Sequence, residues 1–207
     1  MTQSAMSLAN PPLIIACGAL ARELRVVLTA SDLAKTIEVS YLPANLHNSP
    51  SDIVPTLRPM IAAAIARDRP VFVGYSDCGT GGLLDAMLAE FPGVNRLPGA
   101  HCYEMFAGAE CFAELHEAVP GTFYLTDFLA LHFDALVWAG LGLDRHPELR
   151  GIYFGNYTRV VHLAQGNECQ SATAARGAAD RLGLPLVTAA VGRDALRRVV
   201  EQHYGSA

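Results

Sequence analysis

The chain has 207 residues, 51% of them hydrophobic, which is enough to bury the core of one sizeable α/β domain. Its 15 lysines and arginines are scattered and its net charge is −5, so it lacks the basic face that binds nucleic acid. No apolar stretch reaches the roughly 20 residues that cross a bilayer, and no positive charge precedes the apolar segment 12–21, as it would in a signal peptide. We therefore expect a soluble, cytoplasmic protein that binds neither nucleic acid nor membrane.

Apolar segments of strand length alternate with helical patterns along the chain, which is typical of βα units on a parallel sheet. The predicted strands are 13–17, 36–42, 71–75, 94–97, 122–126, 158–163 and 186–190. The predicted helices are 19–28, 51–67, 82–90, 102–117, 127–139, 168–182 and 194–203. The expected fold is one α/β domain over residues 1–207, with an open, mostly parallel sheet, helices on both faces and a flavodoxin-like or Rossmann-like architecture. The stretch 120–165 is where this domain could be subdivided.

The helix predicted at 127–139 is apolar nearly all round. Such a helix is either surrounded by the core or covered by a second subunit. Core packing is the simpler interpretation, and a homo-oligomer stays an open alternative.

The chain contains five cysteines, an odd number, and lacks a secretion signal, which argues against a disulfide framework. Free thiols, metal ligands and catalytic thiols are the alternatives. Cys111 and Cys169 fall inside helical patterns and are interpreted as packing residues. Cys17, Cys78 and Cys102 instead end predicted strands or follow them closely.

Ligand sites of open parallel sheets form beyond the carboxyl ends of the strands. The chemistry-bearing residues expected at this rim are Cys17, His47, Cys78, His101 and Cys102. Thiolate and imidazole are the usual ligands of zinc, with iron as the second choice. The sequence therefore predicts a metal site with Cys17, Cys78 and His101 at its centre, completed by His47 or Cys102. Because these ligands come from separate loops, the site would be catalytic, with an open position for a small-molecule substrate.

Cys78 stands at a predicted strand-to-helix turn, where free N–H groups and the helix dipole favour thiolate over thiol. A glycine-rich run follows, and such a turn lets the backbone approach an anion such as phosphate or carboxylate. The residues expected to contact a cofactor or substrate in this way are Gly79, Thr80, Gly81 and Gly82.

Four polar residues near the predicted strand ends have two interpretations each. Tyr75, Asp77 and Glu104 are candidate acid–base groups, or they orient the imidazole ligands. Capping is the alternative role for these residues. Asp127 begins a predicted helix and is more simply a cap.

Five short motifs occur in a fixed order along the chain. They are Cys-Gly-x-Leu from Cys17, Leu-His-Asn-x-Pro from Leu46, Gly-Tyr-x-x-Cys-Gly-x-Gly-Gly-Leu from Gly74, Pro-x-x-His with a nearby Cys from Pro98, and Pro-Gly-Thr-x-Tyr-Leu-Thr from Pro120. In this order they resemble the domain-of-unknown-function family 1638, from Cys17 to about Leu163. One departure is that many members have His-Asp-Cys at the fourth strand, whereas this chain has His101-Cys102-Tyr103.

The resemblance implies a part in corrinoid-dependent one-carbon metabolism, because members are commonly encoded beside corrinoid proteins and methylamine- or methyltetrahydrofolate-type methyltransferases. It implies a corrinoid protein or a methyltransferase as partner, so that any corrinoid would be reached through that partner. The chain lacks the Asp-x-His-x-x-Gly pattern that supplies a lower axial imidazole in many corrinoid carriers.

Three hypotheses follow. The first is a zinc- or iron-dependent protein of methyl transfer, either a methyltransferase or an accessory protein. The second is a metal-free thiol enzyme with Cys17 and Cys78 in a two-cysteine, racemase-like layout, although this chain has Cys-Gly-Ala and Cys-Gly-Thr where those enzymes have Cys-Asn-Thr-like turns. The third is a non-catalytic module that binds a small molecule or a corrinoid protein.

Overall fold

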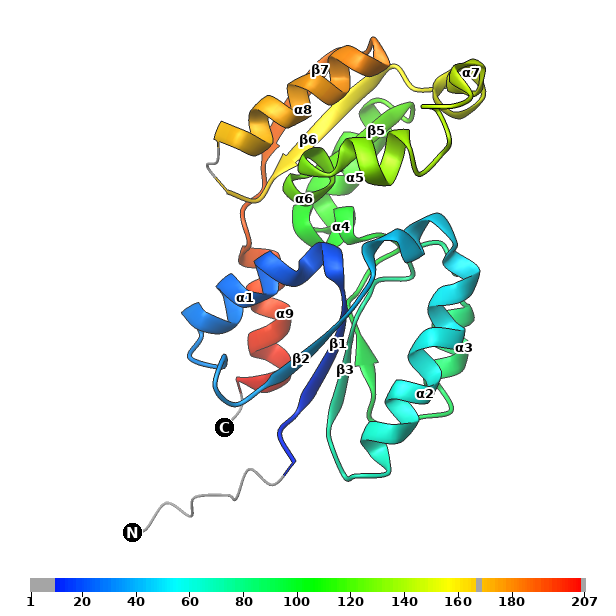
Figure 1. Cartoon of the computed structure of the whole chain (residues 1–207). Coiled ribbons are helices and arrows are strands. Elements are labelled where there is room, and N and C mark those ends of the chain that lie inside the picture. The colour runs from blue at the N-terminus through cyan, green and yellow to red at the C-terminus, as the bar shows by residue number, and fades with distance from the viewer. Residues whose placement is uncertain (1–9, 167–168, 206–207) are drawn as a thin grey trace.

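The structure, a computed structural model, describes residues 10–166 and 169–205, which form two parallel sheets (Figure 1). The first sheet has the order β2-β1-β3-β4 and the second has the order β5-β6-β7. The strands are β1 (Leu13–Cys17), β2 (Glu38–Leu42), β3 (Val71–Gly74), β4 (Asn95–Arg96), β5 (Thr122–Thr126), β6 (Arg159–Ala164) and β7 (Leu186–Ala190). The strands predicted at 13–17, 122–126 and 186–190 have the same bounds in the structure.

Helices cover both faces of each sheet (Figure 1). On the first sheet, α1 (Ala21–Ala30) and α9 (Asp194–Tyr204) cover one face, and α2 (Ile53–Ile65) and α3 (Leu83–Leu88) cover the other. On the second sheet, α4 (Cys102–Ala107) and α5 (Ala109–Ala118) lie opposite α6 (Asp127–Leu131) and α8 (Cys169–Leu182), and α7 (Arg150–Phe154) lies to one side. The expected start of the eighth helix at residue 168 lies outside the described residues. The predicted α/β class, with parallel strands and helices on both faces, is confirmed.

The division into two sheets differs from the single sheet that the sequence predicts. The strand predicted at 94–97 pairs over only two residues, so β4 has few backbone groups with which another strand could pair. The helix predicted at 102–117 is broken at Gly108, whose φ of +80° suits glycine. The resulting α4 and α5 separate β4 from β5, and β5 pairs with β6 instead.

The last helix returns to the first sheet (Figure 1). Leu196 and Val200 of α9 belong to the buried core of that sheet. Arg193, just before α9, forms an ion pair with Glu23 of α1, a carboxylate that is itself buried. The chain therefore closes its first core with its last element.

The apolar segment predicted as a helix at 127–139 consists of α6 followed by a π-helix, Asp134–Trp138. Ala130, Phe133 and Val137 of this segment are buried in the core of the second sheet. Core packing thus accounts for much of its apolar character, and a homo-oligomer stays a prediction. None of the helices in the described part of the chain has both the length and the apolar character needed to cross a bilayer.

Close contact between β1 and β3 makes Gly74 a sensitive position. A Cβ atom at Gly74 would lie 2.5 Å from the Cβ of Ala16 on the neighbouring strand. We predict that Gly74→Ala lowers the free energy of unfolding by about 1–3 kcal/mol through overpacking, as measured by urea denaturation. Gly177→Ala is the control, because a Cβ at this helical position meets nothing within 4 Å and should raise stability by up to about 1 kcal/mol. Equal effects of the two substitutions would contradict the packing argument.

Candidate functional site

Residues from both sheets line one pocket of about 400 Å³. His47, Cys78, His101 and Cys102 enter it from the loops after β2, β3 and β4. Thr126, at the carboxyl end of β5, belongs to the opposite side. A larger hollow of about 580 Å³ lies beside α1 and β2, but none of the five predicted ligands lines it. The carboxyl-end rule therefore leads to the pocket that four of the five predicted ligands line.

Cys17 and His47 form a thiol–imidazole contact next to this pocket. The Cys17 Sγ lies 3.6 Å from the His47 Nδ1 and accepts a hydrogen bond from the Ala19 N–H at 3.4 Å. The same Nδ1 lies 3.2 Å from the Ala44 carbonyl oxygen. Because a carbonyl only accepts, Nδ1 carries the proton and Nε2 carries the lone pair. That Nε2 is buried and has no hydrogen-bond partner within the described residues.

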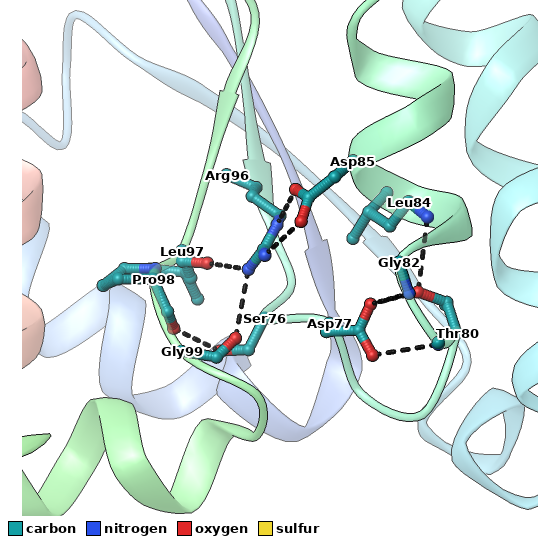
Figure 2. Close-up of polar contacts among 11 residues, drawn as sticks. Ser76, Asp77, Thr80, Gly82, Leu84, Asp85, Arg96, Leu97, Pro98 and Gly99 are labelled. Carbon is teal, nitrogen blue, oxygen red and sulfur yellow. Dashed lines mark hydrogen bonds and ion pairs between the residues drawn. The ribbon is translucent and has the colours of Figure 1, made fainter.

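Cys78 is held in a strained backbone conformation by the loop after β4. Its φ is +51°, in the left-handed region that non-glycine residues rarely adopt. The Cys78 N–H donates to the Ala100 carbonyl at 2.9 Å, and the Asp77 N–H donates to the Gly99 carbonyl at 3.2 Å. The Ser76 hydroxyl donates to the Pro98 carbonyl at 2.8 Å (Figure 2). These three bonds fasten the loop of Cys78 to the loop that leads into His101 and Cys102.

Arg96 of β4 restrains the loop that leads into His101 and Cys102. It forms two hydrogen bonds to the Asp85 carboxylate of α3, at 2.5 and 2.8 Å (Figure 2). It also donates to the carbonyls of Leu97 and Gly99, at 2.8 and 3.1 Å. Bidentate guanidinium–carboxylate pairs are geometrically well defined, so Arg96 limits the freedom of the segment before His101.

Asp77 holds the glycine-rich turn, and its carboxylate occupies the donors that the sequence offers to an anion (Figure 2). It accepts from the Thr80 hydroxyl at 2.6 Å, from the Gly81 N–H at 3.0 Å and from the Gly82 N–H at 2.9 Å. Burial raises the pKa of Asp77, but these bonds and the nearby Arg96 charge outweigh it and leave the pKa below its usual range. Of the predicted ligand-contacting residues in this turn, Gly79 lines the pocket, whereas Thr80, Gly81 and Gly82 do not.

Tyr75 and Glu104, the other candidate acid–base residues, do not line the pocket. The Tyr75 ring stacks on that of His47, with centroids 6.0 Å apart, and burial, followed by the nearby Cys17 and Cys78, raises its pKa. Glu104 accepts a hydrogen bond from the Ala100 N–H at 2.9 Å and so supports the turn before α4. Both contacts orient other groups.

The three thiols have raised pKa values, which corrects the expectation of a thiolate at Cys78. Burial is the main cause, followed by the charges of neighbouring thiols; the pKa of Cys78 rises to about 12, and that of Cys102 is also raised. Burial likewise raises the pKa of Cys17, despite the Ala19 N–H and Tyr75. The helix dipole cannot reverse this, because α3 starts only at Leu83 and the intervening amides bind Asp77.

The structure brings all five predicted ligands into one neighbourhood. Cys17, Cys78 and Cys102 lie close enough for their charges to interact pairwise, and His47 interacts with His101 in the same way. Burial, followed by that second imidazole, lowers the pKa of His47, although its bond to Ala44 opposes this. Among the described residues, however, no three His, Cys, Asp or Glu side chains already surround a common point as metal ligands.

One buried polar pair near the pocket was not expected from the sequence. His162 Nε2 lies 2.8 Å from the Asp127 carboxylate, and both side chains are about 1% exposed. The same carboxylate accepts from the N–H groups of Gln165 and Gly166, at 3.2 and 3.0 Å. The cap of α6 is Thr126, whose hydroxyl accepts from the Leu129 N–H at 3.1 Å, so the expectation of a capping Asp127 is wrong. Alternating apolar residues around a strand histidine were the only sequence signal for this pair.

Alkylation tests the protonation state of the thiols. After treatment with a chelator at pH 7, the exposed Cys169 should react with iodoacetamide, while Cys78 stays unmodified. With a pKa near 12, only about one Cys78 in a thousand is ionised at pH 9, so its labelling should rise steeply only above that pH. Peptide mass spectrometry measures both sites in one sample. Equal labelling of Cys78 and Cys169 at pH 7 would overturn this electrostatic description.

Asp127 should contribute a pH-dependent part of the stability. Burial raises its pKa, but His162 and the other donors lower it further, so the net pKa lies below its usual range. The resulting stabilisation is present above the unfolded pKa of about 4 and is lost as the pH falls below it. Asp127→Asn should cost about 1–3 kcal/mol at pH 7 and flatten the acid limb of a stability–pH curve. Asp134→Asn, at an exposed ion pair with Arg181, is the control and should change stability by less than about 1 kcal/mol.

The family to which the chain belongs follows from a comparison with family models. The model described as "Protein of unknown function (DUF1638)" matches residues 41–200, a range that includes His47, Cys78, His101 and Cys102. A search of curated proteins and a search of solved structures returned no match. Since the matched range covers most of the sequence, the chain belongs to the DUF1638 family.

Proposed function

We propose that this protein binds a thiophilic metal ion, zinc or in second place iron, and presents it to a small substrate in corrinoid-linked methyl transfer. The residues that would hold the ion are Cys17, His47, Cys78, His101 and Cys102. The observation that carries the proposal is the buried Nε2 of His47, which has no hydrogen-bond partner among the described residues, on a ring that lines the same pocket as Cys78 and Cys102.

His47 has the hydrogen-bond arrangement of a metal-ligating imidazole. Such histidines donate their other ring N–H to a carbonyl or carboxylate, which fixes the tautomer and turns the lone pair toward the metal. Here the Ala44 carbonyl is that acceptor, at 3.2 Å. A buried nitrogen without a partner is costly, and a metal ion would satisfy it.

The electrostatics of the cluster also favour a cation. The thiols are buried, and the charge of each ionised thiol raises the pKa of its neighbours further. None of the residues that line the described pocket is Lys or Arg. A divalent ion is the kind of charge that would convert these thiols to thiolates, because a coordinating thiol is deprotonated outright. Since no three candidate ligands within the described part of the chain surround a common point, binding requires rotation of the side chains.

The chemistry that such an ion supplies when bound is Lewis-acid activation of a substrate thiol or another methyl acceptor. The chain's own part is to orient His47 through Ala44, to fasten Cys78 through Ala100, and to exclude water with the apolar side of the pocket. The setting in methyl transfer comes from the family resemblance, and a role as an accessory protein fits the same geometry.

A metal-free thiol enzyme is the second candidate, favoured by the contact of 3.6 Å between Cys17 and His47. Burial opposes it, because it raises the pKa of the thiol and lowers that of the imidazole. Both shifts favour the neutral pair over the thiolate–imidazolium pair that a nucleophile needs.

Elemental analysis of protein purified without a histidine tag tests the proposal. We expect about one zinc or iron per chain, and at least about a hundredfold loss of affinity in His47→Ala and Cys78→Ser. Cys111→Ser is the control, because Cys111 is a half-buried thiol of α5 outside the pocket. Binding should release protons, as measured by calorimetry in buffers of different ionisation enthalpy, and should weaken as the pH falls. Trace metal that is unchanged in Cys78→Ser would remove the proposal.

A further inference from the structure

The pocket that holds the thiols and imidazoles has two chemically different sides. One side carries His47, Cys78, His101 and Cys102, from loops of the first sheet. The other is apolar and is built mainly from α6, the π-helix and the segment that follows it, through Phe128, Leu129, Leu136, Val137 and Leu141. Among the described residues that line the pocket there is no Lys, Arg, Asp or Glu. A charged group on the part of a ligand that lies against this apolar side would therefore lose its hydration without gaining an ionic partner.

The apolar side has an unusual backbone that links it to the other side. The π-helix Asp134–Trp138 supplies Leu136 and Val137, and single π-turns are rare and frequently lie at functional sites. The Leu136 carbonyl accepts a hydrogen bond from the Asn48 side chain at 3.1 Å. Asn48 follows His47 directly, so one short segment contributes an imidazole to the first side and fastens the second.

Several side chains of the apolar side are only half-buried, as expected of a surface that a ligand completes. Phe128, Leu129, Leu136 and Leu141 all fall in this class. The pocket volume of about 400 Å³ lies within the range of small-molecule sites, roughly 300–1,000 Å³. The size and lining suit a compact molecule with one polar end.

We infer that the ligand of this pocket is an uncharged small molecule with an alkyl-like body, which lies against Leu129 and Leu136, and a thiol or thioether sulfur, which faces the cysteines and histidines. The choice of sulfur rests on the proposed function, because a thiophilic metal selects a soft donor. The choice of an uncharged apolar body rests on the lining alone.

Binding of simple thiols tests both parts by isothermal titration calorimetry. The series is 1-propanethiol, 1-butanethiol and 1-pentanethiol, with 3-mercaptopropionate and cysteamine as charged thiols and 1-pentanol as the oxygen analogue. Each added methylene should raise affinity by about fourfold. The two charged thiols should bind at least about tenfold more weakly than 1-butanethiol. A flat dependence on chain length, or equal binding of a charged thiol, would overturn the inference.

A matched pair of substitutions locates the alkyl body. Leu136→Asp should weaken 1-pentanethiol binding more than Leu136→Asn does, because only the first buries a charge against the ligand, and it should favour cysteamine. Leu131→Asp is the control, since Leu131 is an exposed residue of α6 that does not line this pocket. Affinity that is unchanged in both Leu136 variants, with native circular dichroism, would place the body elsewhere and contradict the inference.

Comparison of zinc-loaded and chelator-treated protein separates the two proposals. If the protein binds no metal but still shows the chain-length dependence for alkanethiols and alkanols alike, the proposed metal function fails and the apolar-body inference stands. If zinc binds but the chain-length dependence is absent, the inference fails and the metal function stands. If zinc-loaded protein binds 1-pentanol as tightly as 1-pentanethiol, the assignment of sulfur is wrong.

Discussion

The hydrogen bonding between the loops after β3 and β4 is the constraint on which the candidate site depends. Three bonds, from Ser76 to Pro98, from Asp77 to Gly99 and from Cys78 to Ala100, join segments that lie beyond the ends of two neighbouring strands. They hold Cys78 in a left-handed conformation that an isolated chain would rarely adopt. Arg96 restrains the loop after β4, and Asp77 restrains the loop after β3 (Figure 2). The resulting frame presents a thiol from one loop beside an imidazole and a thiol from the next.

This frame assembles weak acids and bases in a place that favours their neutral forms. Burial acts in opposite directions on thiols and imidazoles, raising the pKa of Cys78 and lowering that of His47. The site therefore carries little charge of its own, and the apolar side contributed by the second sheet adds none. In the proposed function, the metal ion would bring in the charge that the site lacks.

The sequence predicts which residues come together at the site better than it predicts their pKa values. Alternating strands and helices are enough to place Cys17, Cys78 and His101 at the carboxyl end of a parallel sheet, because the direction of each strand follows from the crossover rule. The pKa of Cys78 depends first on its burial and then on the nearby Cys17, and neither has a periodic signal in the sequence. The Asp127–His162 pair is equally hidden, since it joins residues 35 positions apart that each have an ordinary local role.

The division into two sheets also lies beyond what the pattern can show. Strand-length segments at 94–97 and 122–126 look like successive members of one sheet, and only the shortness of β4 and the break at Gly108 separate them. The π-helix at Asp134–Trp138 is hidden in the same way, because its residues continue the apolar pattern of α6. These features arise from competition between alternative packings, which single-sequence periodicity does not measure.

The return of α9 to the first sheet has a consequence for biosynthesis. Leu196 and Val200 complete a core whose strands are made within the first hundred residues, so that core stays open during synthesis of the whole second sheet. Until α9 is made, the apolar surface of the first sheet lacks this cover, and exposed apolar surface of an incomplete core is prone to aggregation.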